Sequence, residues 1–232
     1  MATFVLVHGA GGGAISWQYL APLLTQRGHR VYAPSLTGLG DRAHLGGPEV
    51  NLSTHIQDIV AIMEHLDLSE VVLAGHSYGG MVVTGVADRV PGRIAHLVYL
   101  DALLPADGQS VMDMDGSEQL KALTVEDGWL VVFPEMPPGM PLLPSRGQPI
   151  GTLQEKVQLT LPLEKREFTR TYVKAAGNPP TPRHERTGNF WRAAEQVRFN
   201  PAWRYFEVPA NHSLHREMPQ LVAAILLSLL DA

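Results

Sequence analysis

One short stretch constrains the fold of this chain more than any other. Residues 71–74 are apolar and begin with two β-branched valines, Gly75-His76-Ser77-Tyr78-Gly79 follows, and residues 81–87 have a helix-like composition. A strand, a sharp turn and a helix around G-x-S-x-G are typical of a nucleophile elbow, which holds its serine at positive φ with the hydroxyl exposed above the sheet. Both flanking glycines are expected because a side chain would clash with the crowded backbone. The pattern predicts that Ser77 is a nucleophile; the alternative is a glycine-rich turn that merely contains a serine.

The rest of the chain alternates between strand-like and helix-like segments. Ser53 is expected to cap the second helix, and Leu221, Ile225 and Leu229 to form one face of the last helix. Alternation of this kind predicts an α/β fold with about six strands, mostly parallel, and helices on both faces. The expected strands are 3–7, 29–33, 70–74, 96–100, 170–175 and 204–208, and the expected helices are 14–27, 53–66, 79–90, 187–197 and 219–230.

The chain of 232 residues is long enough for a single domain with a large core and too short for two. The alternation fails over residues 102–165, a stretch that contains eight prolines, four methionines and a tryptophan. This stretch is too long for a plain loop and too apolar for a disordered linker. We expect a small cap over the strand ends, with Trp129 and Met136 facing an apolar substrate pocket. A structural flap without substrate contact is the alternative.

Composition and charge restrict the class of partner. A net charge of −5 without basic clusters argues against nucleic acid and against an anionic membrane surface. The chain has no cysteine, which excludes disulfides and thiol catalysis. The first strand begins at Thr3 without a basic leader, and no apolar run approaches the length of a membrane span. We therefore expect a cytoplasmic enzyme with a small-molecule substrate; whether it is a monomer or a homodimer is left open.

A serine nucleophile needs a base to take its proton and an acid to orient that base. In this architecture the expected chain order is serine, acid, histidine. Of ten histidines, only His212 and His215 follow the last expected strand. The backbone N–H of Tyr78 is the expected donor of an oxyanion hole. His8 and His76 are expected to be buried structural residues, and neither a metal site nor a cofactor is expected.

Several of these motifs resemble those of the α/β-hydrolase family, in particular plant methylesterases, hydroxynitrile lyases and small bacterial esterases. Two further segments are most similar to bacterial carbendazim (carbamate) hydrolases. The resemblance covers nearly the whole chain, is weakest in the cap, and implies a serine esterase for small, largely apolar substrates, with carbamates and amides as further candidates. The matching residues are Val5–Ala10, Trp17, Gly75–Met81 and His212–Pro219 for the family, and Arg42–Leu45 and Tyr99–Ala102 for the carbamate hydrolases.

The resemblance also assigns roles to individual residues. In the family the catalytic histidine stands seven residues before a proline that opens the last helix, a spacing that His212 and Pro219 match. This leaves His215 as a residue that lines the pocket. Ala10 is implied as the second donor of the oxyanion hole. Residues Gly11 to Gly13 are expected to let the chain pass close to the substrate.

The catalytic acid departs from the family pattern. Relatives usually carry an aspartate at the position that aligns with Asn178, and an asparagine cannot supply the negative charge. Asp101 instead closes the preceding strand, and some α/β-hydrolases carry their acid there. We expect Asp101 to be the acid. Glu185, and a mere turn-capping role for Asp101, are the alternatives.

Three other functions compete with a serine hydrolase. Gly9–Ala14 matches the glycine pattern of a Rossmann NAD(P)-binding site, but no acidic residue ends the second strand to hold a ribose. Hydroxynitrile lyases place a lysine after the catalytic histidine, where this chain has Ser213 and Leu214. A non-catalytic ligand receptor on the same fold is the third alternative.

Overall fold

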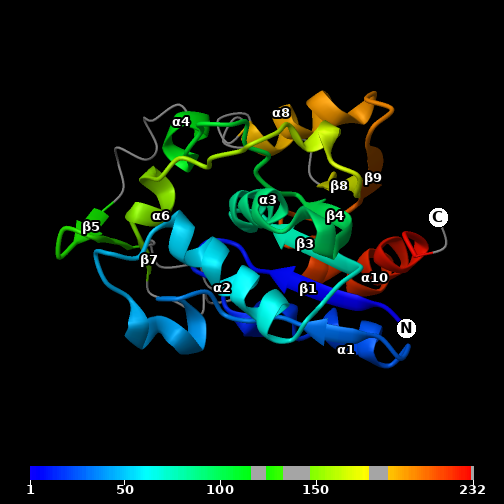
Figure 1. Ribbon diagram of the computed structural model, residues 1–232, viewed down its shortest axis with the longest axis horizontal. Helices are drawn as coiled ribbons and strands as arrows, with labels where there is room; N and C mark the ends of the chain where they lie inside the picture. Colours follow the sequence, from blue (N-terminus) through cyan, green and yellow to red (C-terminus); the bar gives the residue numbers. More distant parts are fainter. Residues whose placement is uncertain (116–123, 133–146, 178–187, 231–232) are drawn as a thin grey trace.

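Six parallel strands form the central sheet (Figure 1). Their order is β2-β1-β3-β4-β8-β9, and every neighbouring pair is parallel, as predicted. The computed structural model describes residues 1–115, 124–132, 147–177 and 188–230. The strands are β1 (Thr3–Val7), β2 (Arg30–Tyr32), β3 (Val71–His76), β4 (Ile94–Leu100), β8 (Thr169–Ala175) and β9 (Arg204–Val208).

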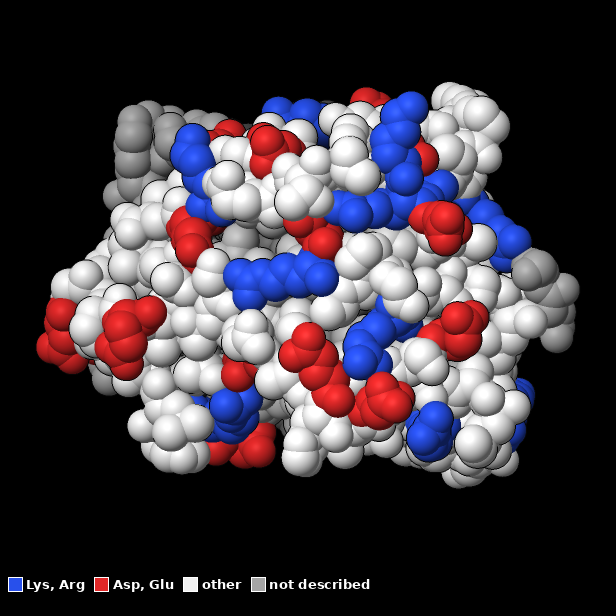
Figure 2. All heavy atoms as spheres, viewed as in Figure 1, with Lys and Arg blue, Asp and Glu red and all other residues white. Residues whose placement is uncertain are grey.

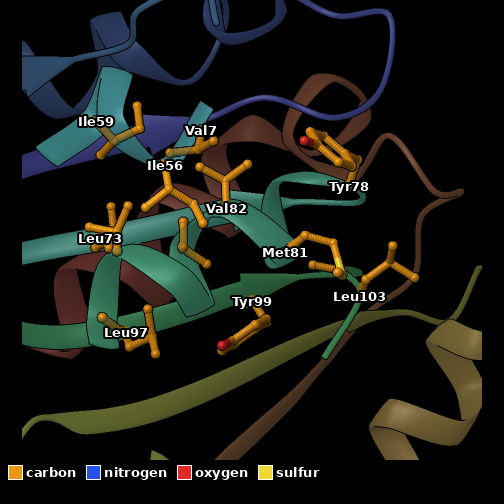
Figure 3. Close-up of a cluster of buried hydrophobic side chains, with 14 of the residues drawn as sticks. Val7, Ile56, Ile59, Leu73, Tyr78, Met81, Val82, Leu97, Tyr99 and Leu103 are labelled. Carbon is orange, nitrogen blue, oxygen red and sulfur yellow. The ribbon is translucent and has the colours of Figure 1, made fainter. Parts of the chain in front are cut away.

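Helices cover both faces of this sheet. Side chains alternate along β1, so that Val5 and Val7 belong to one apolar cluster, whereas Phe4 and Leu6 belong to a second. Helices α2 (Leu52–His65), α3 (Gly79–Arg89) and α8 (Asn189–Arg198) pack on the first cluster. Figure 3 shows Val7 meeting side chains of α2 and α3 there. Helix α10 (Pro219–Ser228) packs on the second cluster, with α1 (Ala21–Thr25) beside it near the termini (Figure 1).

Between β4 and β8 the chain leaves the central sheet, within the 102–165 segment. Strands β5, β6 and β7 form a small antiparallel sheet. Figure 1 shows α4, α6, β5 and β7 together at the end of the molecule away from both termini. Met136 lies outside the described residues. The elements are α4 (Val111–Asp115), β5 (Thr124–Glu126), β6 (Leu130–Val132), β7 (Gly147–Pro149), α6 (Gly151–Gln154) and η4 (Leu163–Lys165).

The predicted N-cap of α2 was wrong by two residues. Asn51 caps this helix, because its side-chain oxygen accepts the backbone N–H of Thr54 at 2.9 Å. Ser53 lies inside the first turn, where its N–H and hydroxyl both donate to Glu155, at 2.6 and 2.8 Å. The serine thus ties α2 to the segment after α6.

Two other helices differ from their sequence predictions. The helix expected over 14–27 is split into η1 (Ala14–Trp17) and α1, because Pro22 has no N–H to donate and its ring would clash with the carbonyl of residue 18. In α10, Leu221 is 37% exposed rather than buried. The buried face follows a helical spacing that begins one residue later, with Val222, Ile225, Leu226 and Leu229.

The remaining helical turns are η2 (Gly40–Leu45), η3 (Pro91–Arg93) and α9 (Leu214–Glu217). No helix in the described part of the chain combines the length and the apolar character that a membrane crossing requires. On the face in Figure 2, acidic and basic side chains are interspersed rather than gathered into patches of one sign.

Candidate active site

Ser77 occupies a strained turn between β3 and α3. Its φ is +54°, as predicted, a conformation that non-glycine residues rarely adopt and that often marks a functional site. The turn is held in place by its backbone, because the Ser77 carbonyl accepts the N–H groups of Gly80 and Leu103, each at 3.0 Å. The serine therefore has a fixed backbone position at the carboxyl end of β3.

The glycines around Ser77 are required by close packing, which confirms the prediction for Gly75 and Gly79. A Cβ built at Gly75 would lie 2.6 Å from the carbonyl oxygen of Gly79, and one at Gly79 would lie 2.5 Å from that of Val7. Gly80, which the sequence pattern did not single out, is more restricted still: its Cβ would lie 2.0 Å from the carbonyl oxygen of Leu103.

Asp101 and His212 are brought together from positions 111 residues apart. His212 Nδ1 donates to Asp101 Oδ2 at 2.7 Å. Asp101 directly follows β4, has a φ of +43° and is 2% exposed, whereas the His212 side chain follows β9 and is 42% exposed. Because β3, β4, β8 and β9 are adjacent and parallel, their carboxyl ends lie along one edge of the sheet. Ser77, Asp101 and His212 all follow strands at this edge.

His76 links the serine turn to the loop that carries His212. Its Nε2 donates to the backbone carbonyl of His212 at 2.9 Å, and the two rings lie 4.7 Å apart. Burial lowers the pKa of His76 to about 3, so its ring is neutral at neutral pH. His76 is thus a buried, hydrogen-bonded structural residue, as expected from the sequence.

Lys174, on β8, was missed by sequence reasoning. Its ammonium donates to Asp101 Oδ1 at 2.7 Å and to the Ala175 carbonyl at 2.8 Å, and lies 4.2 Å from the ring centroid of Trp191. Burial raises the pKa of Asp101, but the hydrogen bond and charge of His212, together with the Lys174 cation, outweigh it and hold that pKa below its usual value. Asp101 is therefore an ionised carboxylate with a partner on each oxygen.

His215 lies deeper in the protein than His212. It is 2% exposed, and its ring lies 4.6 Å from that of Trp17 and 4.3 Å from that of His76. Burial places the pKa of His215 well below its ordinary value. Its expected part in lining the substrate pocket stays a prediction.

The side chain of Tyr78 is anchored by a histidine that sequence reasoning also missed. The Tyr78 hydroxyl donates to His55 Nδ1 at 2.9 Å, and His55 Nε2 donates to the Thr37 carbonyl at 2.8 Å. Burial lowers the pKa of His55 to about 4, so its ring is neutral at neutral pH and links the Tyr78 hydroxyl to the Thr37 carbonyl. This chain of bonds holds the Tyr78 side chain in place. The part of the Tyr78 backbone N–H in an oxyanion hole stays a prediction.

The glycine-rich loop after β1 packs against the serine turn. A Cβ built at Gly9 would lie 2.9 Å from that of Ser77, so the loop and the serine turn are in close contact. The N–H of Gly11 donates to Gln148 Oε1 at 3.0 Å, and Gln148 is fully buried on β7. The 102–165 segment therefore contacts the loop that carries Ala10.

His8 holds the base of the same loop. Its Nδ1 donates to the Gly9 carbonyl at 2.8 Å, and its Nε2 accepts the N–H of Leu36 at 3.0 Å. Burial lowers the pKa of His8 to about 4, which keeps the ring neutral. His8 is a buried, hydrogen-bonded structural residue, as expected.

The parts in substrate binding that the sequence predicts for Trp129 and Met136 stay predictions. The Trp129 indole lies against Gly46, where a built Cβ would be 3.3 Å from Cη2. Met136, Asn178 and Glu185 lie outside the described residues. Within the described ranges, no group of three or more histidine, aspartate or glutamate side chains is arranged to hold a metal ion.

The parallel sheet with a strained serine between β3 and α3 defines the α/β-hydrolase class of fold. The chain belongs to the alpha/beta hydrolase family, whose sequence profile matches residues 4–225.

Individual relatives align over about half of the chain. The carbendazim hydrolyzing esterase of Nocardioides sp. is 54% identical over 112 residues, which are 48% of this chain and 46% of that protein. The pyrethroid hydrolase of Sphingobium wenxiniae is 38% identical over 107 residues, 45% of this chain and 37% of that protein. The chain thus spans about half or less of the length of these relatives.

Solved structures match over the whole chain. An extracellular alpha/beta-hydrolase from a Paenibacillus species superposes with a TM-score of 0.81 at 24% identity, covering 99% of both chains. A pyrethroid hydrolase from Sphingobium faniae superposes with a TM-score of 0.78 at 24% identity, covering 100% of this chain and 98% of that one. At this identity the two structures establish the shared fold.

Proposed function

We propose that this protein is a serine hydrolase that cleaves carboxylic esters of small, largely apolar molecules. The observation that carries the proposal is the Asp101–His212 pair at the sheet edge that also presents Ser77. A buried, ionised carboxylate bonded to a half-exposed imidazole is the arrangement that a serine nucleophile needs for activation.

In the proposed first step, the Ser77 hydroxyl oxygen attacks the acyl carbon while His212 Nε2 takes its proton. Asp101 accepts the Nδ1–H bond, which fixes the imidazole tautomer and stabilises the cation that forms. The backbone N–H groups of Tyr78 and Ala10 receive the developing oxyanion. The backbone bonds that hold the serine turn support this role for Tyr78, because they restrain the residue directly after Ser77 before the substrate binds.

The tetrahedral intermediate then expels the alcohol, which leaves with the proton held by His212. This gives an acyl-enzyme on Ser77. Water attacks the acyl carbon while His212 takes its proton; the Ser77–acyl bond then breaks, His212 returns the proton to the Ser77 oxygen, and the carboxylic acid is released. Carbamates and amides would follow the same route with a different leaving group or acyl part.

Similarity to the carbendazim hydrolyzing esterase and the pyrethroid hydrolase supports this class of substrate. Each alignment covers less than half of the named protein, so the proposal takes from these relatives the class of substrate alone. We favour esters as the substrate class. Carbamates are the second candidate, because the relative named for carbendazim is more similar to this chain than the relative named for pyrethroids.

A fluorophosphonate probe tests the nucleophile. Wild-type protein is expected to become covalently labelled at Ser77, because the probe reacts with serines activated by a base. Ser77→Ala is expected to abolish labelling, whereas Ser69→Ala, at an exposed serine before β3, labels as the wild type does. Gel fluorescence and peptide mass spectrometry read out the result. Undiminished labelling of Ser77→Ala would exclude the proposed nucleophile.

We also propose that residues 102–165 cap the substrate pocket. The Gln148–Gly11 bond supports this, since it seats the segment on the loop beside Ser77. Trp129→Ala is expected to change the ratio of kcat/KM between short-chain and long-chain acyl esters by about tenfold, the effect of losing an apolar contact to one substrate. Phe199→Ala, at a residue 87% exposed beyond α8, serves as the control. An unchanged ratio in Trp129→Ala would show that Trp129 does not contact the substrate.

A further inference from the structure

We propose that Lys174 is a positioning residue of the reaction centre, whose cation keeps Asp101 ionised and aimed at His212. This inference rests on the proposed function, because it assigns Lys174 to the same acid–base pair. Lys174 is not expected to touch the substrate. It acts through Asp101.

The geometry divides the Asp101 carboxylate between two partners. Oδ1 accepts from the Lys174 ammonium at 2.7 Å and from the N–H of Ala175 at 3.3 Å, and Oδ2 accepts from His212 at 2.7 Å. With Oδ1 held on the β8 side, rotation of the carboxylate would break a short charged bond. Lys174 therefore fixes the oxygen that faces the imidazole.

The lysine is itself held in one position. It is 3% exposed, donates to the Ala175 carbonyl at 2.8 Å, and its ammonium stacks 4.2 Å from the Trp191 ring centroid. A buried ammonium is costly unless it is paired, and Asp101 supplies the pairing charge. The packing around Lys174 thus brings a full positive charge to the carboxylate.

Strand register explains why these two residues meet. β4 and β8 are parallel with Leu100 opposite Val173, and the N–H of Asp101 continues the ladder to the Val173 carbonyl at 2.7 Å. Asp101 directly follows Leu100, and Lys174 directly follows Val173, so the two residues are neighbours across the strand pair. An aspartate placed at this strand end therefore meets a lysine from the neighbouring strand.

The charge has a consequence for the base. His212 must be neutral to accept the proton of Ser77, and the Asp101 carboxylate favours the protonated imidazole. The Lys174 cation on the opposite oxygen offsets part of that attraction. Removing this cation makes the pair bind a proton more readily, so a higher pH is needed to free the base.

The two buried histidines near His212 stay uncharged over the relevant pH range. His76, from the end of β3, has its pKa lowered to about 3 by burial, and the pKa of His215 on the adjoining turn is also well below its usual value. On α8, Phe190 packs against His212, with 4.5 Å between the two ring centroids. The charged groups around His212 are the buried pair Asp101 and Lys174, and Arg216 and Glu217 on α9. The Glu217 carboxylate accepts the N–H of Asn211 at 2.9 Å.

The test measures the pH dependence of kcat/KM for an activated ester, normalised to probe-labelled active sites. Lys174→Met and Lys174→Gln, which both remove the charge, are expected to move the acidic limb upward by about one pH unit, with KM within about threefold of wild type. Lys174→Arg, which keeps the charge, is expected to leave the limb in place. Arg30→Met, at an exposed residue of β2, removes one positive charge at the amino-terminal end of the strands and controls for net charge.

A purely structural role for Lys174 predicts a different pattern. The neutral variants would then lose thermal stability, while the acidic limb and kcat per active site stayed at wild-type values. That result would overturn the proposal. If neither neutral variant folds, Lys174→Arg decides: a folded enzyme with a displaced acidic limb would show that charge at this position is not what matters.

Failure of the proposed function remains distinguishable from failure of this inference. If wild-type Ser77 takes no probe, the serine hydrolase proposal fails before Lys174 is considered. If wild type and Lys174→Met both take the probe and share one pH profile, the hydrolase stands and only the positioning role is lost.

Discussion

His212→Ala is expected to lower kcat/KM for an activated ester by about 10⁶-fold, the loss seen when a serine hydrolase loses its catalytic histidine. Without the imidazole, Ser77 keeps its position but has no group to take its proton. The oxyanion donors and the binding surface remain, so a residual rate above that in water is expected.

The neighbouring histidine supplies the matched control. His215 is buried between Trp17 and His76, and its Nδ1 has no hydrogen-bond partner among the described residues. A desolvated imidazole without a carboxylate is a poor proton acceptor. His215→Phe, which keeps a ring in the same place, is therefore expected to stay within about tenfold of wild type and to alter substrate preference more than rate.

Steady-state kinetics on both variants, with folding checked by circular dichroism, decide between the two histidines. A large loss in His215→Phe together with a modest loss in His212→Ala would mean that the spacing to Pro219 had selected the wrong base. Similar large losses in both folded variants would point to a role for His215 beyond packing.

The parts of the fold that were predictable depend on local sequence. Ser77 was recognisable because a strained turn needs glycines at fixed positions, and the structure requires them at Gly75 and Gly79. The positions of the strands followed from short apolar runs. Thr3–Val7 and Arg204–Val208 match their predicted bounds, and the other four strands differ from theirs by one or two residues at one or both ends. These features are set by a few adjacent residues.

The features that sequence reasoning missed depend on partners far along the chain. Lys174 reads as a surface residue of a strand until the pairing of β4 with β8 places it beside Asp101. Gln148 bonds to Gly11 across 137 residues, and nothing local to either residue indicates the contact. The signal that could have found Lys174 was an aspartate ending one predicted strand and a lysine near the end of the next.

Asp101→Asn is expected to lower turnover per active site by about 10⁴-fold, as loss of the triad carboxylate does in serine proteases. Asparagine suits this position sterically, because it tolerates the positive φ of +43° better than most residues. The substitution therefore removes the charge and keeps the turn. Glu185→Gln is expected to stay close to wild type.

Lys174 changes how the stability of Asp101→Asn must be interpreted. Removing one member of a buried ion pair typically costs about 3–5 kcal/mol, because the remaining charge is left without a partner. Lower stability is thus expected in Asp101→Asn whether Asp101 is the triad acid or a turn cap. Melting temperature alone cannot separate the two roles.

Turnover per folded molecule separates them, and a double variant removes the remaining ambiguity. Asp101→Asn/Lys174→Met eliminates both buried charges, so it is expected to recover stability relative to Asp101→Asn while turnover remains about 10⁴-fold below wild type. Thermal unfolding and probe-titrated kinetics on the two single variants and the double variant complete the comparison. Near-normal turnover in folded Asp101→Asn would show that another carboxylate is the triad acid. Glu185→Gln would then be expected to lower turnover instead.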